Sequence, residues 1–434
     1  MSRPHHSDPA RHDPYSAIRH PNFRAYLSGN ILATIGQQMQ TVAVGWELYE
    51  RTGSALALGG VGLAQVLPII LLTLPAGHVS DRYPRIRVVM VSQLLFAACS
   101  GGLALVSLAH GPLSLVYLLL VLTGVARSFQ APAKGALLPQ IVEPSRFSNA
   151  VTWNSVGWQL AAVIGPALGG AVIGLSHRAA PVYFIDMAAA LGFLLLLFRV
   201  RPLVSMSPTP ASIRGLLDGV RFLRGTPVLL AAITLDLFAV LLGGAVTLLP
   251  VFAKDILHVG PSGLGWLLSA QSIGAVLMLL TLAHRPFSNA GPALLRSVIG
   301  FGLATVVFGL SRSFWLSFAM LVLMGALDGV SVVIRSTLVQ VRTPDHLRGR
   351  VAAINSLFIG TSNELGGFES GAVASLIGPV AAVVAGGIGT VVVVAVTARV
   401  WPEIRTLRRL EEPERPLNPT VAEYDQPSHS KGPA

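Results

Sequence analysis

The chain consists mainly of long apolar runs that are separated by short polar stretches. An apolar run of about 18 residues or more is long enough to cross the hydrocarbon core of a bilayer as a helix. Such runs follow one another along nearly the whole chain, and the pattern predicts an all-α integral membrane protein with 12 transmembrane helices. The predicted spans are residues 23–49, 54–80, 88–109, 112–138, 147–176, 180–198, 227–252, 262–283, 292–311, 314–340, 349–377 and 379–400.

The longest polar interruption between spans, "RVRPLVSMSPTPASIRGLLDGVRFLRGTP", divides the chain into two sets of six spans. We therefore predict a six-helix bundle at residues 23–199, a cytoplasmic linker at 200–226 and a second six-helix bundle at 227–401. Between Ser212 and Leu223 the linker has one apolar face, which predicts an amphipathic helix lying against the membrane. The cytoplasmic tails, residues 1–22 and 402–434, are polar and proline-rich, and we expect them to be mostly disordered, apart from a short charged helix after Pro402.

The two halves resemble each other at an offset of about 200 residues. "PQIVEP", which ends at Pro144, is matched by "VQVRTP", which ends at Pro344, and "GVAR" is matched by "GALD". Repeats of this kind indicate two pseudo-symmetric halves related by an axis along the membrane normal. Such halves can rock against each other around a central site.

Composition supports the membrane assignment and explains the net charge of +11. Hydrophobic residues make up 52% of the chain and charged residues only 12%, whereas a soluble domain has about 25% charged residues. Basic residues are rare on one side of the predicted spans, where we find Arg51, Arg178, Lys254 and Arg312. The other side carries thirteen arginines, namely Arg82, Arg85, Arg87, Arg146, Arg201, Arg214, Arg221, Arg224, Arg285, Arg296, Arg342, Arg348 and Arg350.

This asymmetry follows the positive-inside rule, and it predicts that both termini are cytoplasmic. The basic residues therefore mark topology, and we do not expect nucleic acid to be a partner. Cys99 is the single cysteine, and none of the eleven histidines lies deep in a predicted span. We therefore expect no enzymatic activity, no cofactor and no metal site.

The short turn between the second and third spans, "GHVSDRYPRIR", is densely charged. It places Gly77, Asp81 and Arg82 at the end of one helix and Arg85 and Arg87 at the start of the next. A carboxylate in this position can accept hydrogen bonds from the N-terminus of a neighbouring helix, whose dipole favours an anion. These residues could therefore form a cytoplasmic latch that opens when the halves move apart.

Small residues recur in the fifth span, in "AAVIGPALGGAV". Gly165, Gly169 and Gly170 would allow close helix contact, and Pro166 would bend the helix and remove one donor. The pattern can mark a functional element, or it can reflect the ordinary packing of membrane helices, in which small residues are common.

The loop pattern resembles the Gly-x-x-x-Asp-Arg-x-x-Arg signature of the major facilitator superfamily, and the fifth span resembles the Gly-Pro-x-x-Gly-Gly element of its antiporters. "RTGSALALGGVGLAQ", "LLPVFAKDIL" and "TPDHLRGRVAAINSLF" are similar to the bacterial branch that includes the enterobactin (siderophore) exporters. The resemblance implies a monomeric, proton-driven exporter in the bacterial inner membrane, working by alternating access. Two features depart from the family. Leu120 lies near the position at which many drug antiporters carry an arginine. The loop "AHRPFSNAGPALLR" lacks a counterpart of Asp81.

Ionisable residues inside spans are costly, and they usually mark a cavity or a partner. In the superfamily spans one, four, seven and ten line the central cavity, which by resemblance singles out Arg127, Asp236, Asp328 and Arg335. Asp236 and Asp328 are the candidates for proton coupling, with the two arginines as charge partners. A permanent structural ion pair is the alternative. Asp186 ranks last, because its helix usually faces away from the cavity in this family.

Polar residues inside the spans are candidates for contact with a small-molecule substrate, and they suit an amphiphilic compound larger than a sugar. They are Gln37, Gln40, Asn154, Gln271 and Glu364. Two other functions remain open at this point. A proton-coupled importer would share the fold, and a non-transporting receptor or scaffold would tolerate loss of Asp236 and Asp328.

Overall fold

The computed structural model describes residues 13–203, 220–284 and 289–407, and this part of the chain is helical and contains no strand. The helices of the N-terminal half are α1 (Pro21–Thr52), α2 (Ala55–Arg82), α3 (Arg85–Leu108), α4 (Leu113–Ile141), α5 (Phe147–Ser176) and α6 (Ala180–Leu197). Those of the C-terminal half are α8 (Pro227–Leu242), η2 (Ala245–Leu248), α9 (Leu249–Val251), η3 (Phe252–Ile256), α10 (Gly260–His284), α11 (Ala290–Leu310), α12 (Phe314–Arg342), α13 (Asp345–Ile377), α14 (Pro379–Val400) and α15 (Glu403–Thr406).

Length and composition qualify 10 helical segments of the described residues as membrane spans. Two further helices, α1 with 32 residues and α13 with 33, exceed the length needed to span a bilayer but are more polar than the others. Both belong to the bundles, and both contribute polar side chains to the cavity described below. The count of 12 spans stays a prediction.

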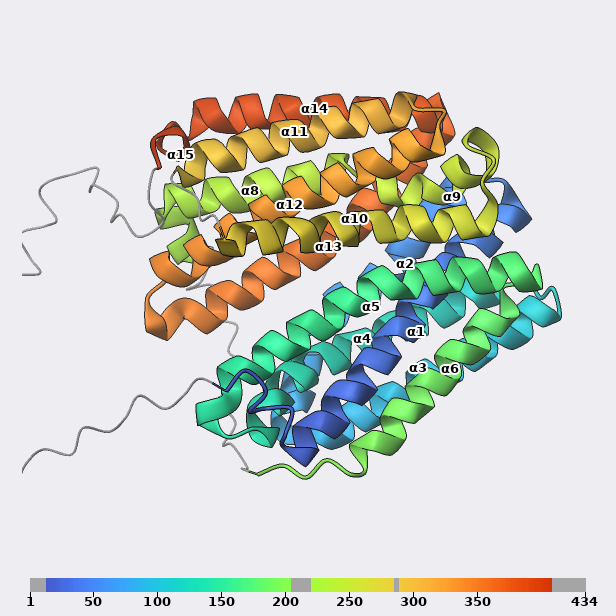
Figure 1. The fold of residues 1–434 in the computed structure, drawn as a ribbon, viewed down its shortest axis with the longest axis vertical. Coiled ribbons are helices and arrows are strands. Elements are labelled where there is room, and N and C mark those ends of the chain that lie inside the picture. Colours follow the sequence, from blue (N-terminus) through green and yellow to red (C-terminus); the bar gives the residue numbers. More distant parts are fainter. Residues whose placement is uncertain (1–12, 204–219, 285–288, 408–434) are drawn as a thin grey trace, which may run out of the picture.

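The helices form two bundles, one from each half of the chain (Figure 1). In the N-terminal half α1 packs on α5 and α6, α3 packs on α4 and α6, and α2 packs on α4. In the C-terminal half α12 packs on α10 and α11, and α14 packs on α11, α8 and α13. The packing recurs in both halves, since α4 packs on α2 and α3 as α12 packs on α10 and α11, and α3 packs on α6 as α11 packs on α14. The sequence repeat therefore marks a real structural repeat.

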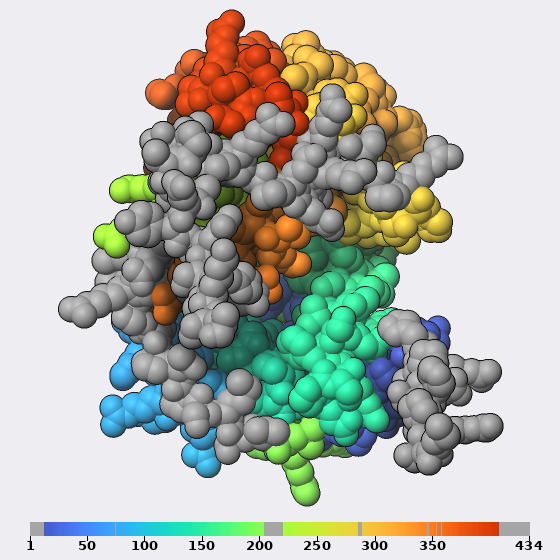
Figure 2. All heavy atoms as spheres, turned by 90° about the vertical axis from the view of Figure 1, so that its left-hand side faces the viewer, coloured from blue at the N-terminus to red at the C-terminus, as the bar shows by residue number. Residues whose placement is uncertain are grey.

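The two bundles share an apolar core at one end only. One cluster of buried residues joins both halves and includes Leu48, Leu120, Leu248 and Phe308. At the opposite end each half has its own cluster, around Phe23 in one and around residues of α8 and α11 in the other. We call the shared end the joined end and the opposite one the split end. Figure 1 shows the bundles meeting on the right and diverging to the left, and Figure 2 looks onto the split end.

Two helix pairs form the seams between the halves, α5 with α10 and α2 with α13. Glycines make these approaches possible, because a side chain would meet the backbone of the partner helix. A Cβ added at Gly170 would lie 2.9 Å from the Cα of Gly265, and one added at Gly371 would lie 2.8 Å from the Cα of Gly59. Packing of small residues is the usual way in which membrane helices associate, since lipid offers no hydrophobic driving force between helices.

The structure departs from the predicted spans in the seventh span. The sequence predicted one run over residues 227–252, whereas α8 ends at Leu242 and the chain continues as η2, α9 and the π-helical turn η3 to Ile256. Gly243 and Gly244 lie at the break, and Gly244 faces the backbone of Gly366 on α13. Interrupted helices of this kind occur beside the binding sites of transporters, where they line a cavity.

The tails also differ from the sequence prediction where they are described. Residues 13–20 pack on the start of α5, where Pro14 O accepts hydrogen bonds from Asn149 Nδ2 at 2.7 Å and Trp153 Nε1 at 2.9 Å. At the other end Ile404 of α15 is fully buried, and Leu407 O accepts a hydrogen bond from Gly291 N. Residues 13–22 are therefore ordered, contrary to the predicted disorder, whereas α15 agrees with the short charged helix predicted after Pro402. Residues 1–12 and 408–434, most of the predicted linker helix (212–219) and part of the loop after α10 (285–288) lie outside the described residues.

Candidate transport site

A cavity of about 500 Å³ lies between the two halves. Its walls come from α1, α2, α4 and α5 on one side and from η2, α9, α10 and α13 on the other. The lining residues are Gln38, Gln40, Thr41, Val44, Gly45, Leu58, Val61, Gly62, Gln65, Arg127, Trp158, Val246, Thr247, Pro250, Leu264, Leu268, Gly360, Asn363, Glu364 and Gly367. This volume lies within the range of about 300–1,000 Å³ that small-molecule sites occupy.

An ion pair crosses this cavity from one half to the other. Arg127 Nη1 lies 3.6 Å from Glu364 Oε1 of α13, and it donates a hydrogen bond to Gln65 Oε1 of α2 at 3.0 Å. Both charged side chains are partly exposed, Arg127 to 38% and Glu364 to 27%, so water in the cavity reaches them. The pair can therefore be broken and re-formed without burying a lone charge.

Close helix packing sets the position of these three side chains. Gly124 of α4 lies against the backbone of Gln65, and Gly62 of α2 lies against the backbone of Glu364. A Cβ at either glycine would come within 2.6 Å of a carbonyl oxygen of its neighbour. Helix α2 is thus held between α4 and α13, and the ion pair forms across it.

The rest of the cavity wall combines amides and hydroxyls with apolar groups. Gln38, Gln40 and Thr41 come from α1, Thr247 from η2 and Asn363 from α13. Trp158 of α5 is 55% exposed and adds an aromatic face. Such a wall suits a substrate with both apolar rings and hydrogen-bonding groups.

The structure separates the predicted substrate contacts into two groups. Gln40 and Glu364 line the cavity, whereas Gln37, Asn154 and Gln271 are not among its lining residues. Asn154 instead accepts a hydrogen bond from Asn30 within the N-terminal half. Asn363 and Thr247 also line the cavity, and neither was predicted from the sequence. The polar pair Asn363–Glu364 inside a glycine-rich helix was the signal that could have identified the first of them.

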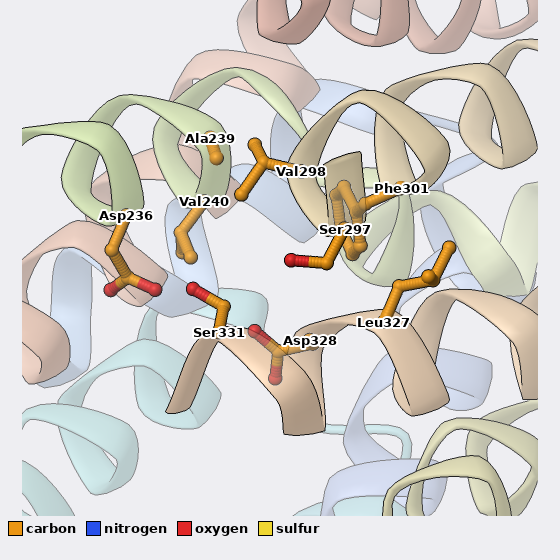
Figure 3. Close-up of a pocket in the computed structure, with 9 residues that line it drawn as sticks. All are labelled: Asp236, Ala239, Val240, Ser297, Val298, Phe301, Leu327, Asp328 and Ser331. Atoms are coloured by element: carbon orange, nitrogen blue, oxygen red, sulfur yellow. The ribbon is translucent and has the colours of Figure 1, made fainter. Parts of the chain in front are cut away.

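Asp236, Asp328 and Arg335 do not line this cavity, contrary to what the resemblance implied. They lie inside the C-terminal half, and Asp236 and Asp328 line a separate small pocket between α8, α11 and α12 (Figure 3). The orientation of α12 is the reason. Asp328, Ser331 and Arg335 share one helix face, and that face is turned toward α8 and α11 rather than toward the central cavity.

This pocket is small, polar and largely shielded from solvent. Asp236 forms an ion pair with Arg335, and the two side chains are only 8% and 4% exposed. The hydroxyls of Ser297 and Ser331 and the carboxyls of Asp236 and Asp328 point toward one another in Figure 3. The volume of this pocket, about 20 Å³, suffices for one water molecule. Among the described residues, Asp328 has no ion-pair partner.

Side-chain contacts between α1 and η3 help to close the joined end. Tyr49 donates a hydrogen bond to Asp255 Oδ2 across the two halves, and Lys254 Nζ lies 5.6 Å from the centre of the Tyr49 ring. Two hydroxyls of α10 add to this closure along α5, since Ser269 donates to Val163 O at 2.7 Å and Ser262 donates to Gly170 O at 3.3 Å.

Replacing Tyr49 with phenylalanine should loosen the joined end without disturbing either half. The hydrogen bond from Tyr49 to a carboxylate contributes about 1.5–3 kcal/mol to closure, so closure should weaken by that amount. The measurement is the rate at which a thiol reagent added from the joined end labels a cysteine introduced at Thr41 in a Cys99→Ser background. Tyr117→Phe is the matched control, because Tyr117 donates to Ala57 O at 2.8 Å within the N-terminal half. Equal labelling rates in the two variants would contradict this role of Tyr49.

The small residues of α5 pack against helices in both halves. Gly165 and Gly169 face Gln38 and Met39 of α1 inside the N-terminal half. Gly170 and the carbonyl of Pro166 face Gly265 of α10 in the other half. The element therefore lies both within a bundle and on the seam between bundles.

The charged turn lies at the split end, between α2 and α3. Asp81 and Arg82 lie in the last turn of α2, and Arg85 and Arg87 lie in the first turn of α3. A Cβ added at Gly77 would meet nothing within 4 Å. No helix backbone approaches Gly77 closely in this conformation, and the latch at the split end stays a prediction.

Two bundles of apolar helices with a cavity between them define a membrane protein of the major facilitator fold. The family described as "Transmembrane secretion effector" matches residues 12–425, and the chain belongs to this family of the major facilitator superfamily. Curated relatives include the enterobactin exporter EntS of Shigella boydii and that of Escherichia coli. Each is 28% identical over 404 residues, which cover 90% of this chain and 94% of the relative.

Solved structures of other transporters share the fold. A bacterial homologue of the human lysosomal transporter Spinster, in its inward-facing and unoccupied conformation, superposes with a TM-score of 0.71 at 16% identity and covers 90% of this chain and 99% of its own. A bacterial homologue of the iron transporter ferroportin, also inward-facing, gives 0.67 at 18% identity over 90% of this chain and 100% of its own. The protein is thus a multi-pass membrane protein with a well-represented transporter fold.

Proposed function

We propose that the protein exports an amphiphilic small molecule of the siderophore type across the bacterial inner membrane, in exchange for protons and by alternating access. The observation that carries the proposal is the cavity between the halves, closed by glycine seams at one end and crossed by the Arg127–Glu364 ion pair. Arginines concentrate in the loops of the split end, so the positive-inside rule makes that end cytoplasmic. The family and its enterobactin-exporting relatives support the direction and the substrate class.

Alternating access requires that the joined end can open while the split end closes. The seams α5–α10 and α2–α13 consist of small residues and few polar contacts, which favours separation as rigid surfaces. We infer that Arg127 and Glu364 pair while the joined end is closed, and that substrate competes for both of them. The charged turn between α2 and α3 would then act as the latch of the closed split end.

Proton coupling is assigned to the pocket around Asp328. A carboxyl group enclosed by apolar helices favours its neutral form unless a cation faces it. Asp236 already has Arg335 as its partner, whereas Asp328 has none among the described residues. Asp328 therefore takes up the proton, and the Asp236–Arg335 pair provides a neighbour whose rearrangement can release it.

Export is tested in inside-out vesicles, in which the cytoplasmic side faces the medium. When respiration acidifies the lumen, enterobactin added outside should accumulate, and a protonophore should abolish the accumulation. An importer would not load these vesicles, and a receptor or scaffold would bind enterobactin without concentrating it. Either outcome would overturn the proposal.

Asp328→Asn should reduce gradient-driven accumulation by about tenfold or more, because asparagine cannot take up the driving proton and one pH unit of gradient is worth about 1.4 kcal/mol per proton, a factor of about ten. Exchange of enterobactin across vesicles without a gradient should continue, since the central cavity is unchanged. Glu369→Gln is the matched control, because Glu369 lies on α13 but lines neither the cavity nor the pocket. Full accumulation by Asp328→Asn would remove Asp328 from the coupling mechanism.

A further inference from the structure

A third carboxyl group lies inside a bundle, and neither the cavity nor the pocket of Figure 3 includes it. Asp186 of α6 is 1% exposed and faces α1 and α3 in the N-terminal half. Its Oδ1 atom is buried without a hydrogen-bond partner among the described residues. A Cβ added at Gly36 of α1 would lie 2.6 Å from this oxygen, so α1 covers Asp186 closely.

Ser100 of α3 offers Asp186 two alternative hydrogen-bond arrangements. Its Oγ lies 2.5 Å from Asp186 Oδ2 and 3.0 Å from Phe96 O. A hydroxyl group has one proton to donate, so it cannot serve both acceptors at once. When Asp186 is ionised, Ser100 donates to the carboxylate. When Asp186 is protonated, it donates to Ser100, and Ser100 donates to Phe96 O.

Gln40 connects this group with the central cavity. Its Nε2 donates to Ser100 Oγ at 3.3 Å, and the same residue lines the cavity wall. Only the side chains of Gln40 and Ser100 are thus needed to link the cavity with Asp186.

Few charged groups surround Asp186. Arg127 of α4 pairs with Glu364 across the cavity. Lys134, also of α4, binds Asn30 Oδ1 at 2.9 Å and lies over the Phe193 ring further along α6. On α1 Glu47 pairs with Arg51 at 3.5 Å, and Tyr183 of α6 donates to Glu47 Oε2. Helix α5, which also packs on α6, has no charged residue between Phe147 and Ser176.

We propose that Asp186 is a second proton-binding site, which exchanges its proton with the water of the central cavity through the Ser100 hydroxyl. Ser100 passes its proton to Asp186 Oδ2 while its oxygen takes one proton from water, so one O–H bond breaks and one forms at Ser100, and Gln40 holds Ser100 in place by donating to Oγ. This inference rests on the proposed function, because a proton-driven exporter is the kind of protein that would use a second proton-binding site.

The test is infrared difference spectroscopy of the protein in liposomes, titrated with pH and without any substrate. The wild-type protein should show a carboxylic acid C=O band that disappears as the pH rises. Asp186→Asn should lack this band, and Ser100→Ala should shift its frequency because a hydrogen bond is lost. Asp328→Asn should remove a different band.

Two results would overturn the proposal. Spectra of Asp186→Asn that match the wild type at every pH would show that Asp186 never binds a proton. A band assigned to Asp186 that does not change with pH would show a fixed neutral acid. If Asp186→Asn does not fold, the Ser100→Ala shift decides the question. Since no substrate is present, these results are independent of whether enterobactin is transported.

Discussion

Replacing Asp236 with asparagine is expected to destabilise the protein by about 3–5 kcal/mol, the cost of leaving one partner of a buried ion pair without its counter-charge. Asp236 and Arg335 are 8% and 4% exposed, and Arg335 keeps its charge in the variant. Thermal unfolding of the purified protein in detergent micelles should show a large fall in melting temperature. The loss of folded protein should lower export as well.

The control removes both charges of this pair. Replacing Asp236 with leucine and Arg335 with methionine substitutes apolar groups of similar size, and such exchanges are often neutral or stabilising. The double variant should therefore melt near the wild type, while its proton-coupled export is lost. A single variant as stable as the double variant would show that the pair is not buried as a unit.

The second large effect is expected on transport rather than on stability. Glu364→Gln should lower gradient-driven accumulation of enterobactin by about 5–150-fold, the range for loss of a coupling of about 1–3 kcal/mol between two states. Glutamine has nearly the same shape as glutamate but carries no charge, and Arg127 then lacks its partner across the cavity. Both side chains are partly exposed, so the variant should remain folded.

A double-mutant cycle identifies this ion pair as the cause. If Arg127 and Glu364 act together, Arg127→Gln should reduce accumulation as much as Glu364→Gln, and combining the two should add little. Additive losses would mean that the residues act separately. Export by Glu364→Gln at the wild-type rate would exclude the ion pair from the transport cycle altogether.

Some features of the site could be read from the sequence and others could not. Intramembrane charges are rare, so Arg127, Asp236, Asp328, Arg335 and Glu364 stood out from the apolar background. The sequence did not indicate which of these charges pair, because pairing depends on the face that each helix presents to its neighbours. The family resemblance implied that Asp236 lines the cavity, whereas Asp236 pairs with Arg335 of α12 inside the C-terminal half. Asp186 was ranked last because its helix usually faces away from the cavity in this family. In the structure, Ser100 and Gln40 connect it with the cavity wall.

The sequence by itself determined the helical membrane fold and its division into two related halves. Both follow from local properties, since the length of an apolar run must match the thickness of the bilayer and every backbone group must be satisfied within its own helix. Only the tertiary structure decided which end is joined, where the seventh span breaks and which charges meet. Contacts such as Arg127–Glu364 and Tyr49–Asp255 join residues more than 200 positions apart. Their formation depends on how two bundles fit together, and no local pattern in the chain encodes that fit.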